Sequence, residues 1–164
     1  MDPVTLSVAL ALPREQVFDY LSDIANHAEF SDHYLVDWRL TREDPVGVGA
    51  GARFRITQPL NRFAWGDLSI VDLQRPYRIV LRGRSGKYNR IKMVAVYELR
   101  ERHGGGTDLS YSFETDASMP SDRLREMLGG RGWVRRKSRR ALKRLQAILE
   151  HDAKRGARPT VAAG

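Results

Sequence analysis

The side chains most able to do chemistry gather in one short stretch, LSDIANHAEFSDHYLVDW, residues 21–38. It holds three Asp, one Glu, two His and one Asn between apolar positions, and such groups can bind a metal ion or transfer protons. The spacing argues against a metal. His27 and His33 are six residues apart, so on one helix they would point about 120° away from each other, and no HExxH pattern is present. We therefore expect no metal site.

Most polar residues of this stretch fit structural roles. We expect Asp23 to cap a short helix, Asn26 to bridge a tight connection, and His27 and Glu29 to be solvated. His33 differs because it stands where the second predicted helix gives way to the sheet, and an imidazole there can act as a general base near neutral pH. Two interpretations of His33 stay open, a general base and an ordinary surface histidine.

The elements that must position these residues follow from apolar periodicity. A period of two predicts strands over residues 4–12, 34–40, around 54–56, 62–73, 77–84, 91–100 and 108–114. After the first strand, Pro13 and the apolar spacing predict two short helices, 14–21 and 24–30. A long helix is predicted over 121–152, with a kink or a close approach of the sheet at Gly129, Gly130 and Gly132.

Composition bounds the class of protein. The 164 residues are 41% hydrophobic and 29% charged, which is typical of one soluble globular domain. The absence of cysteine excludes disulfides, thiolate catalysis, iron–sulfur clusters and cysteine-based zinc sites. The first residues do not form a signal peptide, and no run approaches the roughly 20 apolar residues of a membrane-spanning helix. We expect a cytoplasmic location; the sequence makes no prediction of oligomeric state.

Several longer motifs resemble one known superfamily. The segments PREQVFDYLSDIANHAEFSDHY, DPVGVGAGARFRI, GDLSIVDLQRPYRIVLRG, YEL and GGGTDLSYSFE are similar to landmarks of the START-like (SRPBCC) superfamily, in its polyketide cyclase/dehydrase and lipid-transport branch. The resemblance covers roughly residues 3–152. It implies an α+β helix-grip fold, in which a curved antiparallel sheet of about seven strands, in the order β-α-α-β6-α, wraps round a long C-terminal helix and leaves an apolar cavity. We expect a START-like ligand-binding domain over 1–153 and a flexible basic tail over 154–164.

The candidate ligand-binding residues are mostly aromatic side chains on the apolar faces of the predicted strands. Three further apolar residues come from the predicted helix 121–152. The full set is Tyr34, Trp38, Phe54, Trp65, Met93, Tyr97, Tyr111, Phe113, Leu124, Leu128 and Trp133. Two interpretations stay open. These residues fill a solid core, or their polar atoms and rings hold a planar apolar ligand.

Two functions of different class fit this picture. The first is non-catalytic binding or transport of a small hydrophobic ligand, aromatic, polyketide or lipid-like. The second is an enzyme of the polyketide cyclase or aromatase kind, which needs an acid/base and a group that stabilises an enolate. Candidate acid/base residues are His33, Tyr97 and Tyr111, and candidate cations are Arg82 and Arg90, although strand parity points both arginines outward. Neither function calls for a cofactor.

The net charge of +8 suggests a third possibility. Residues 1–121 carry 15 Lys and Arg against 16 Asp and Glu, whereas residues 122–164 carry 13 against 4. The segment RGWVRRKSRRALKRL, residues 131–145, holds eight of these cations. It could bind RNA or an acidic membrane, or form an ordinary solvated helix face.

Overall fold

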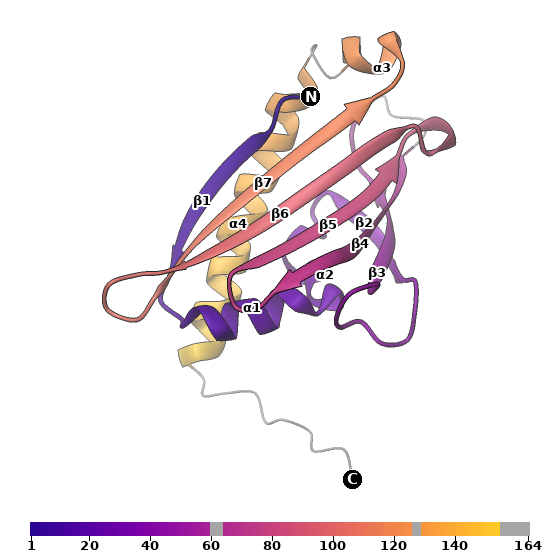
Figure 1. Cartoon of the computed structure of the whole chain (residues 1–164). Helices are drawn as coiled ribbons and strands as arrows, with labels where there is room; N and C mark the ends of the chain where they lie inside the picture. Colours follow the sequence, from indigo (N-terminus) through magenta and orange to yellow (C-terminus); the bar gives the residue numbers. More distant parts are fainter. Residues whose placement is uncertain (60–63, 126–128, 155–164) are drawn as a thin grey trace.

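The computed structural model describes residues 1–59, 64–125 and 129–154 (Figure 1). Leu128 and residues 155–164, almost all of the predicted tail, lie outside this range. The strands are β1 (Val4–Leu10), β2 (Leu35–Leu40), β3 (Gly51–Ile56), β4 (Trp65–Gln74), β5 (Arg78–Ser85), β6 (Ile91–Glu101) and β7 (Thr107–Ala117). The helices are α1 (Arg14–Ser22), η1 (Ile24–Asn26), α2 (His27–Ser31), η2 (Lys87–Asn89), α3 (Pro120–Arg125) and α4 (Arg131–Lys154).

The seven strands form one curved antiparallel sheet in the order β1-β7-β6-β5-β4-β3-β2. Because consecutive strands from β2 to β7 are neighbours, hairpins build most of the sheet, and only β1 pairs with a strand from the far end of the chain. Figure 1 shows α4 running along the sheet, with α1 and α2 gathered toward the C-terminal end of α4. The predicted helix-grip architecture is therefore confirmed.

The alternation of buried and exposed residues in β6 and β7 shows which face of the sheet is covered by α4. Met93, Ala95, Tyr97 and Leu99 are buried, while their neighbours in the sequence are more exposed. Tyr111 continues the same face on β7, where it is paired with Tyr97. Successive strand side chains point to opposite faces, so this parity turns the aromatic rings toward α4.

The polar stretch before β2 follows the sequence predictions with one exception. The Asp23 side chain accepts a hydrogen bond from the Ala25 N–H at 2.9 Å, and the Asn26 amide donates to the Tyr20 carbonyl at 2.9 Å. His27 was predicted to be solvated, and this is wrong. Its ring is buried, with Nε2 2.8 Å from the Leu21 carbonyl oxygen. A satisfied polar atom allows this histidine to join the core.

Strand β2 departs from the predicted alternation. The pairing of β2 with β3 shifts between Val36 and Arg39, and Asp37 takes a positive φ of 56°. An extra residue in one strand reverses the parity beyond it. Beyond the shift Leu40 pairs with the buried Ala52 and so lies on the inner face, yet it is exposed because it ends β2, a strand at the edge of the sheet.

The predicted helix 121–152 is two helices, α3 and α4. Gly129 has a φ of +128°, a conformation that favours glycine. The break was expected at this glycine group. It allows α3 to lie over the end of β7, while α4 takes a separate direction along the sheet (Figure 1). None of the helices in the described part of the chain is long and apolar enough to cross a membrane.

The core is solid at one end of the sheet. There the second half of α4 supplies Leu142, Leu145 and Leu149, which join Phe18 and Leu21 of α1 in one buried cluster. Burial of each such side chain stabilises the fold by about 1.5–3 kcal/mol. Residues 131–140 of α4 do not contribute to this cluster, and the space beside them is the candidate site.

Candidate ligand-binding site

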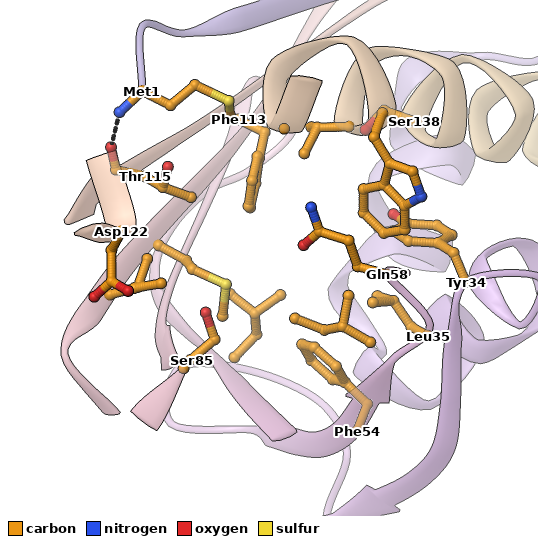
Figure 2. A pocket seen from close by; sticks show the side chains of 18 of the residues that line it. Met1, Tyr34, Leu35, Phe54, Gln58, Ser85, Phe113, Thr115, Asp122 and Ser138 are labelled. Atoms are coloured by element: carbon orange, nitrogen blue, oxygen red, sulfur yellow. Dashed lines mark hydrogen bonds between the residues drawn. The ribbon is translucent and has the colours of Figure 1, made fainter. Parts of the chain in front are cut away.

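A cavity of about 270 Å³ lies between the sheet and the first half of α4 (Figure 2). Its wall is mostly apolar, and the apolar side chains that line it are Met1, Leu35, Phe54, Ile56, Leu68, Ile91, Met93, Phe113, Trp133 and Val134. Six strands and α4 contribute to the lining. Concave, mainly apolar sites with a few polar groups are typical of small-molecule pockets, whose usual range of roughly 300–1,000 Å³ begins just above this volume.

The residue pattern of α4 explains why the cavity stops where it does. Trp133, Val134 and Ser138 face the cavity, and Ala141, Leu142 and Leu145 follow them into the solid core. This inward row keeps helical spacing. Ser138 is buried at the boundary between the two regions, and its small side chain leaves space that a leucine would fill.

Three hydroxyl groups meet at the α4 side of the cavity. Tyr34 and Tyr111 line the cavity, and each is hydrogen-bonded to the Ser138 side chain. Burial raises the pKa of Tyr34 to about 12, and burial also raises the pKa of Tyr111 well above its ordinary value. The two tyrosines therefore stay protonated at neutral pH. They offer hydrogen bonds to a ligand rather than acting as bases.

Charged groups line the opposite side. Arg90 and Asp122 form an ion pair with 3.2 Å between Nη2 and Oδ2, and Lys87 lies beside them in the lining. Figure 2 shows Asp122 and Thr115 across the cavity from Tyr34 and Ser138. The expectation that Arg82 points outward is confirmed by its exposure. The same expectation is wrong for Arg90, because this residue precedes β6 in a turn and strand parity does not apply to it.

Six of the residues predicted from the sequence line this cavity: Tyr34, Phe54, Met93, Tyr111, Phe113 and Trp133. They come from β3, β6, β7, α4 and the residue before β2, so the fold brings together side chains spread over 100 positions. The Tyr34 and Trp133 rings meet edge to face, with 5.9 Å between centroids.

The other described candidates lie outside the lining. Trp38 stacks on Phe54 with 5.2 Å between ring centroids, and its buried Nε1 has no hydrogen-bond partner. Tyr97 is buried behind Tyr111, with 5.0 Å between ring centroids. Trp65 and Leu124 are exposed at 39% and 56%. Leu124 lies on α3, which projects beyond the sheet (Figure 1).

His33 lies next to the cavity but not in its lining. Its Nε2 is 3.2 Å from the Lys137 carbonyl oxygen, and its Nδ1 is 3.4 Å from Nη1 of Arg144. The ring also packs on Tyr34, with 4.8 Å between centroids. Partial burial lowers the pKa of His33, and the nearby cations Arg140, Arg144 and Lys137 lower it further. This histidine ties α4 to the start of β2. In the described residues, no three His, Asp or Glu side chains gather as a metal site.

Sequence reasoning missed several polar lining residues, namely Gln58, Ser85, Asp122 and Ser138. For Ser138 a signal was available, since it falls four residues after Val134 on the apolar row of α4. Gln58 lies just beyond β3, and Figure 2 shows its amide reaching into the cavity. No period marks a residue in such a loop, so Gln58 had no comparable signal.

Comparison with known proteins supports the architecture. Residues 1–150 match a family model described as polyketide cyclase / dehydrase and lipid transport. No match is found among functionally curated proteins. A conserved protein from Geobacillus kaustophilus has a TM-score of 0.65 at 17% identity, covering 92% of this chain and 96% of its own. A protein from Chromobacterium violaceum has a TM-score of 0.61 at 18% identity, with 92% and 99% covered.

A third structure comes from a biosynthetic locus. DynU16, from the dynemicin biosynthetic locus, has a TM-score of 0.59 at 16% identity. The alignment covers 92% of this chain but only 48% of DynU16. At such identities the three likenesses show a shared fold and nothing about a shared ligand.

Proposed function

The chain belongs to the polyketide cyclase/dehydrase and lipid-transport family, and from this premise we propose that it binds a small hydrophobic ligand in the cavity between the sheet and α4. The observation that carries the proposal is the cavity itself, about 270 Å³ of space lined mostly by apolar and aromatic side chains. Apolar surface that lines the empty pocket is removed from water when a ligand of matching shape binds, and each Å² of apolar surface so buried contributes roughly 25 cal/mol to binding.

Retention of ligands tests the proposal directly. We expect the full chain, equilibrated with a panel of small aromatic and lipid-like compounds, to retain a subset of them in native mass spectrometry. Val134→Trp places a large side chain in the cavity and should abolish retention. Lys143→Trp adds the same side chain on the exposed face of α4 and should leave retention unchanged.

Folding must be checked in both variants by circular dichroism. If Val134→Trp does not fold, Ile56→Phe fills the cavity from β3 instead. Equal retention by the wild type and a folded, cavity-filled variant would contradict the proposal, as would a wild type that retains no compound of the panel.

A cyclase-type enzyme is the alternative, and the site offers it hydrogen-bond donors. The hydroxyls of Tyr34, Tyr111 and Ser138 could stabilise an enolate oxygen. A general base is harder to assign. The carboxylate in the described lining, that of Asp122, is paired with Arg90, while His33 and Tyr97 stand outside the lining. Binding without turnover therefore has the better support.

Turnover of a poly-β-keto mimic separates the two functions. If the chain is an enzyme, Tyr111→Phe should lower kcat because it removes a hydroxyl from the cavity. Tyr97→Phe should change kcat less because Tyr97 does not line it. Binding of the mimic with no product formed by the wild type would leave the carrier function as the better description.

A further inference from the structure

The cavity is polar at both ends, but its two ends differ in charge. Hydroxyl groups of Tyr34, Tyr111 and Ser138 form the end beside α4, which we call the hydroxyl end. Lys87, Arg90 and Asp122 lie at the other, which we call the charged end. Figure 2 shows Ser138 and Tyr34 on one side and Asp122 on the other, with Phe113 and Phe54 between them.

Resting on the proposed function, we infer that the ligand places a neutral oxygen, a carbonyl or a hydroxyl, at the hydroxyl end and directs any ionised group to the charged end. The ligand class is thus a small ring compound or other apolar body that carries a ketone, quinone, phenol or alcohol. A ligand that enters with a carboxylate first is excluded.

Hydrogen-bond capacity at the hydroxyl end supports a neutral oxygen. Three hydroxyls bring three protons, and the bonds of Tyr34 and Tyr111 to Ser138 use two of them. If the third proton is not donated to the helix backbone, it is free for a carbonyl oxygen. If Ser138 donates it to a backbone carbonyl, as helical serines can, the tyrosine oxygens keep lone pairs for a ligand hydroxyl.

Charge at the hydroxyl end disfavours an anion. In the described lining the basic side chains, Lys87 and Arg90, lie at the charged end and none lies at the hydroxyl end. Lys137 on α4 places its Nζ 5.9 Å from the centroid of the Trp133 ring and does not line the cavity. Arg140 and Arg144 lie near His33, which is also outside the lining. A buried carboxylate without a paired cation is strongly unfavourable.

The charged end contains cations, which the hydroxyl end lacks. The Arg90 Nε and the Asp122 Oδ2 are both buried without a hydrogen-bond partner, although that Oδ2 lies 3.2 Å from Nη2 of the same guanidinium as an ion pair, and with Lys87 beside them the three side chains carry one net positive charge. An unsatisfied buried donor calls for an acceptor, and together with the Lys87 ammonium it favours an oxygen anion or a strong acceptor on the ligand. The turn that holds this end is strained, with positive φ angles at Tyr88 and Asn89, as is common at binding sites.

Three compounds with one ring system test the inference. They are 2-acetylnaphthalene, with a neutral carbonyl; 2-isopropylnaphthalene, its apolar counterpart of similar shape; and 2-naphthoate, an anion. Binding is measured by equilibrium dialysis at pH 7. We expect 2-acetylnaphthalene to bind at least tenfold more tightly than either of the others.

Tyrosine variants test whether the hydroxyl end causes this difference in affinity. Tyr34→Phe combined with Tyr111→Phe should lower the affinity for 2-acetylnaphthalene to that of 2-isopropylnaphthalene, whose own affinity should not change. Tyr77→Phe is the matched control, because Tyr77 is an exposed tyrosine that packs under Arg14 away from the cavity. It should leave all three affinities unchanged.

The outcomes separate this inference from the proposed function. Equal binding of the three compounds, or tightest binding of 2-naphthoate, would overturn the neutral-oxygen inference while supporting a hydrophobic pocket. Equal losses for the acetyl and isopropyl compounds in the double variant would overturn it too. Failure of all three to bind, the apolar one included, would contradict the proposed function, and the inference with it.

Discussion

Tyr34, Tyr97 and Tyr111 are the residues whose chemistry is most altered by the fold. Tyr97 and Tyr111 are buried and Tyr34 is partly buried, and burial raises the pKa of each above the ordinary value of 10.0. A tyrosine that must stay neutral in the folded state couples ionisation to unfolding. The same burial that prepares the hydroxyl end of the cavity therefore limits the pH range of the fold.

Alkaline pH should destabilise the protein steeply. The folded-state pKa values of these tyrosines are raised, so their contribution is fully present below pH 10 and is lost as pH rises above it. Urea unfolding between pH 8 and pH 11, followed by circular dichroism, measures this loss. Tyr97→Phe should flatten the dependence above pH 10, whereas Tyr77→Phe, at an exposed position, should leave it as steep as in the wild type.

Acid should destabilise the protein through His27. Burial lowers the pKa of this ring below its ordinary 6.5, so the unfolded state takes up a proton first. The stability is fully present above about pH 6.5 and falls as pH drops below it toward the folded-state pKa. His33, whose pKa is also lowered, adds to the loss in the same range.

Replacement of His27 separates its contribution to the acid destabilisation from that of His33. His27→Gln keeps a donor for the Leu21 carbonyl but does not titrate, so the fall in unfolding free energy between pH 7 and pH 5 should become shallower. His103→Gln, in an exposed turn, should retain the wild-type slope. Identical slopes in all three proteins would refute the assignment to His27.

Among the elements, glycines show where backbones approach closely and where they do not. Gly83 lies in β5 opposite Leu68 and Met93, and a Cβ built there would overlap the carbonyl oxygen of Asp67 on β4. Gly132 lies in the first turn of α4, where the nearest atom to a Cβ is Nη1 of Arg136 at 3.8 Å. The two positions should therefore respond to alanine in opposite directions.

We expect Gly83→Ala to lower the free energy of unfolding by about 1–3 kcal/mol, because the strands must move apart. Gly132→Ala should raise it by about 0.5–1 kcal/mol, since alanine favours the helix and restricts the unfolded chain. Urea denaturation of both variants measures the difference. A stabilised Gly83→Ala protein would show that β4 and β5 are not packed as closely as described.

Regular elements could be predicted because periodicity reports which face is buried. The alternation in β6 and β7 correctly placed Met93 and Tyr111 on the inner face. Irregular backbone has no such period. The shift at Asp37 and the turn that brings Arg90 inward depend on pairing with neighbouring strands, which no local pattern contains. The sequence therefore predicted much of the apolar wall and missed most of its polar groups.

At the scale of the whole molecule, α4 carries a dense run of exposed cations. Arg135, Arg136, Arg139 and Arg140 are all exposed on α4, while the inward row of the same helix faces the cavity and the core. The charge and the cavity thus belong to opposite faces of one helix. Changes on the outer face should leave ligand binding intact.

Reversal of these four charges tests what the basic face does. The Glu variants should elute from immobilised heparin at clearly lower salt than the wild type, because fewer counterions are released on binding. Filter binding with single-stranded RNA and flotation with vesicles of phosphatidylcholine and phosphatidylglycerol then distinguish a nucleic acid from a membrane partner. Unchanged elution would show that this face does not contact polyanions.

The cavity takes its lining from segments far apart in the chain, because β2 begins at residue 35 and α4 at residue 131. While the ribosome is still making residues before 131, α1 and α2 can cover one end of the sheet, but the inner face that will line the cavity lacks α4. The nascent protein must therefore pass through a stage in which its future binding surface is open to water or to a chaperone, and the cavity closes only after α4 has been synthesised.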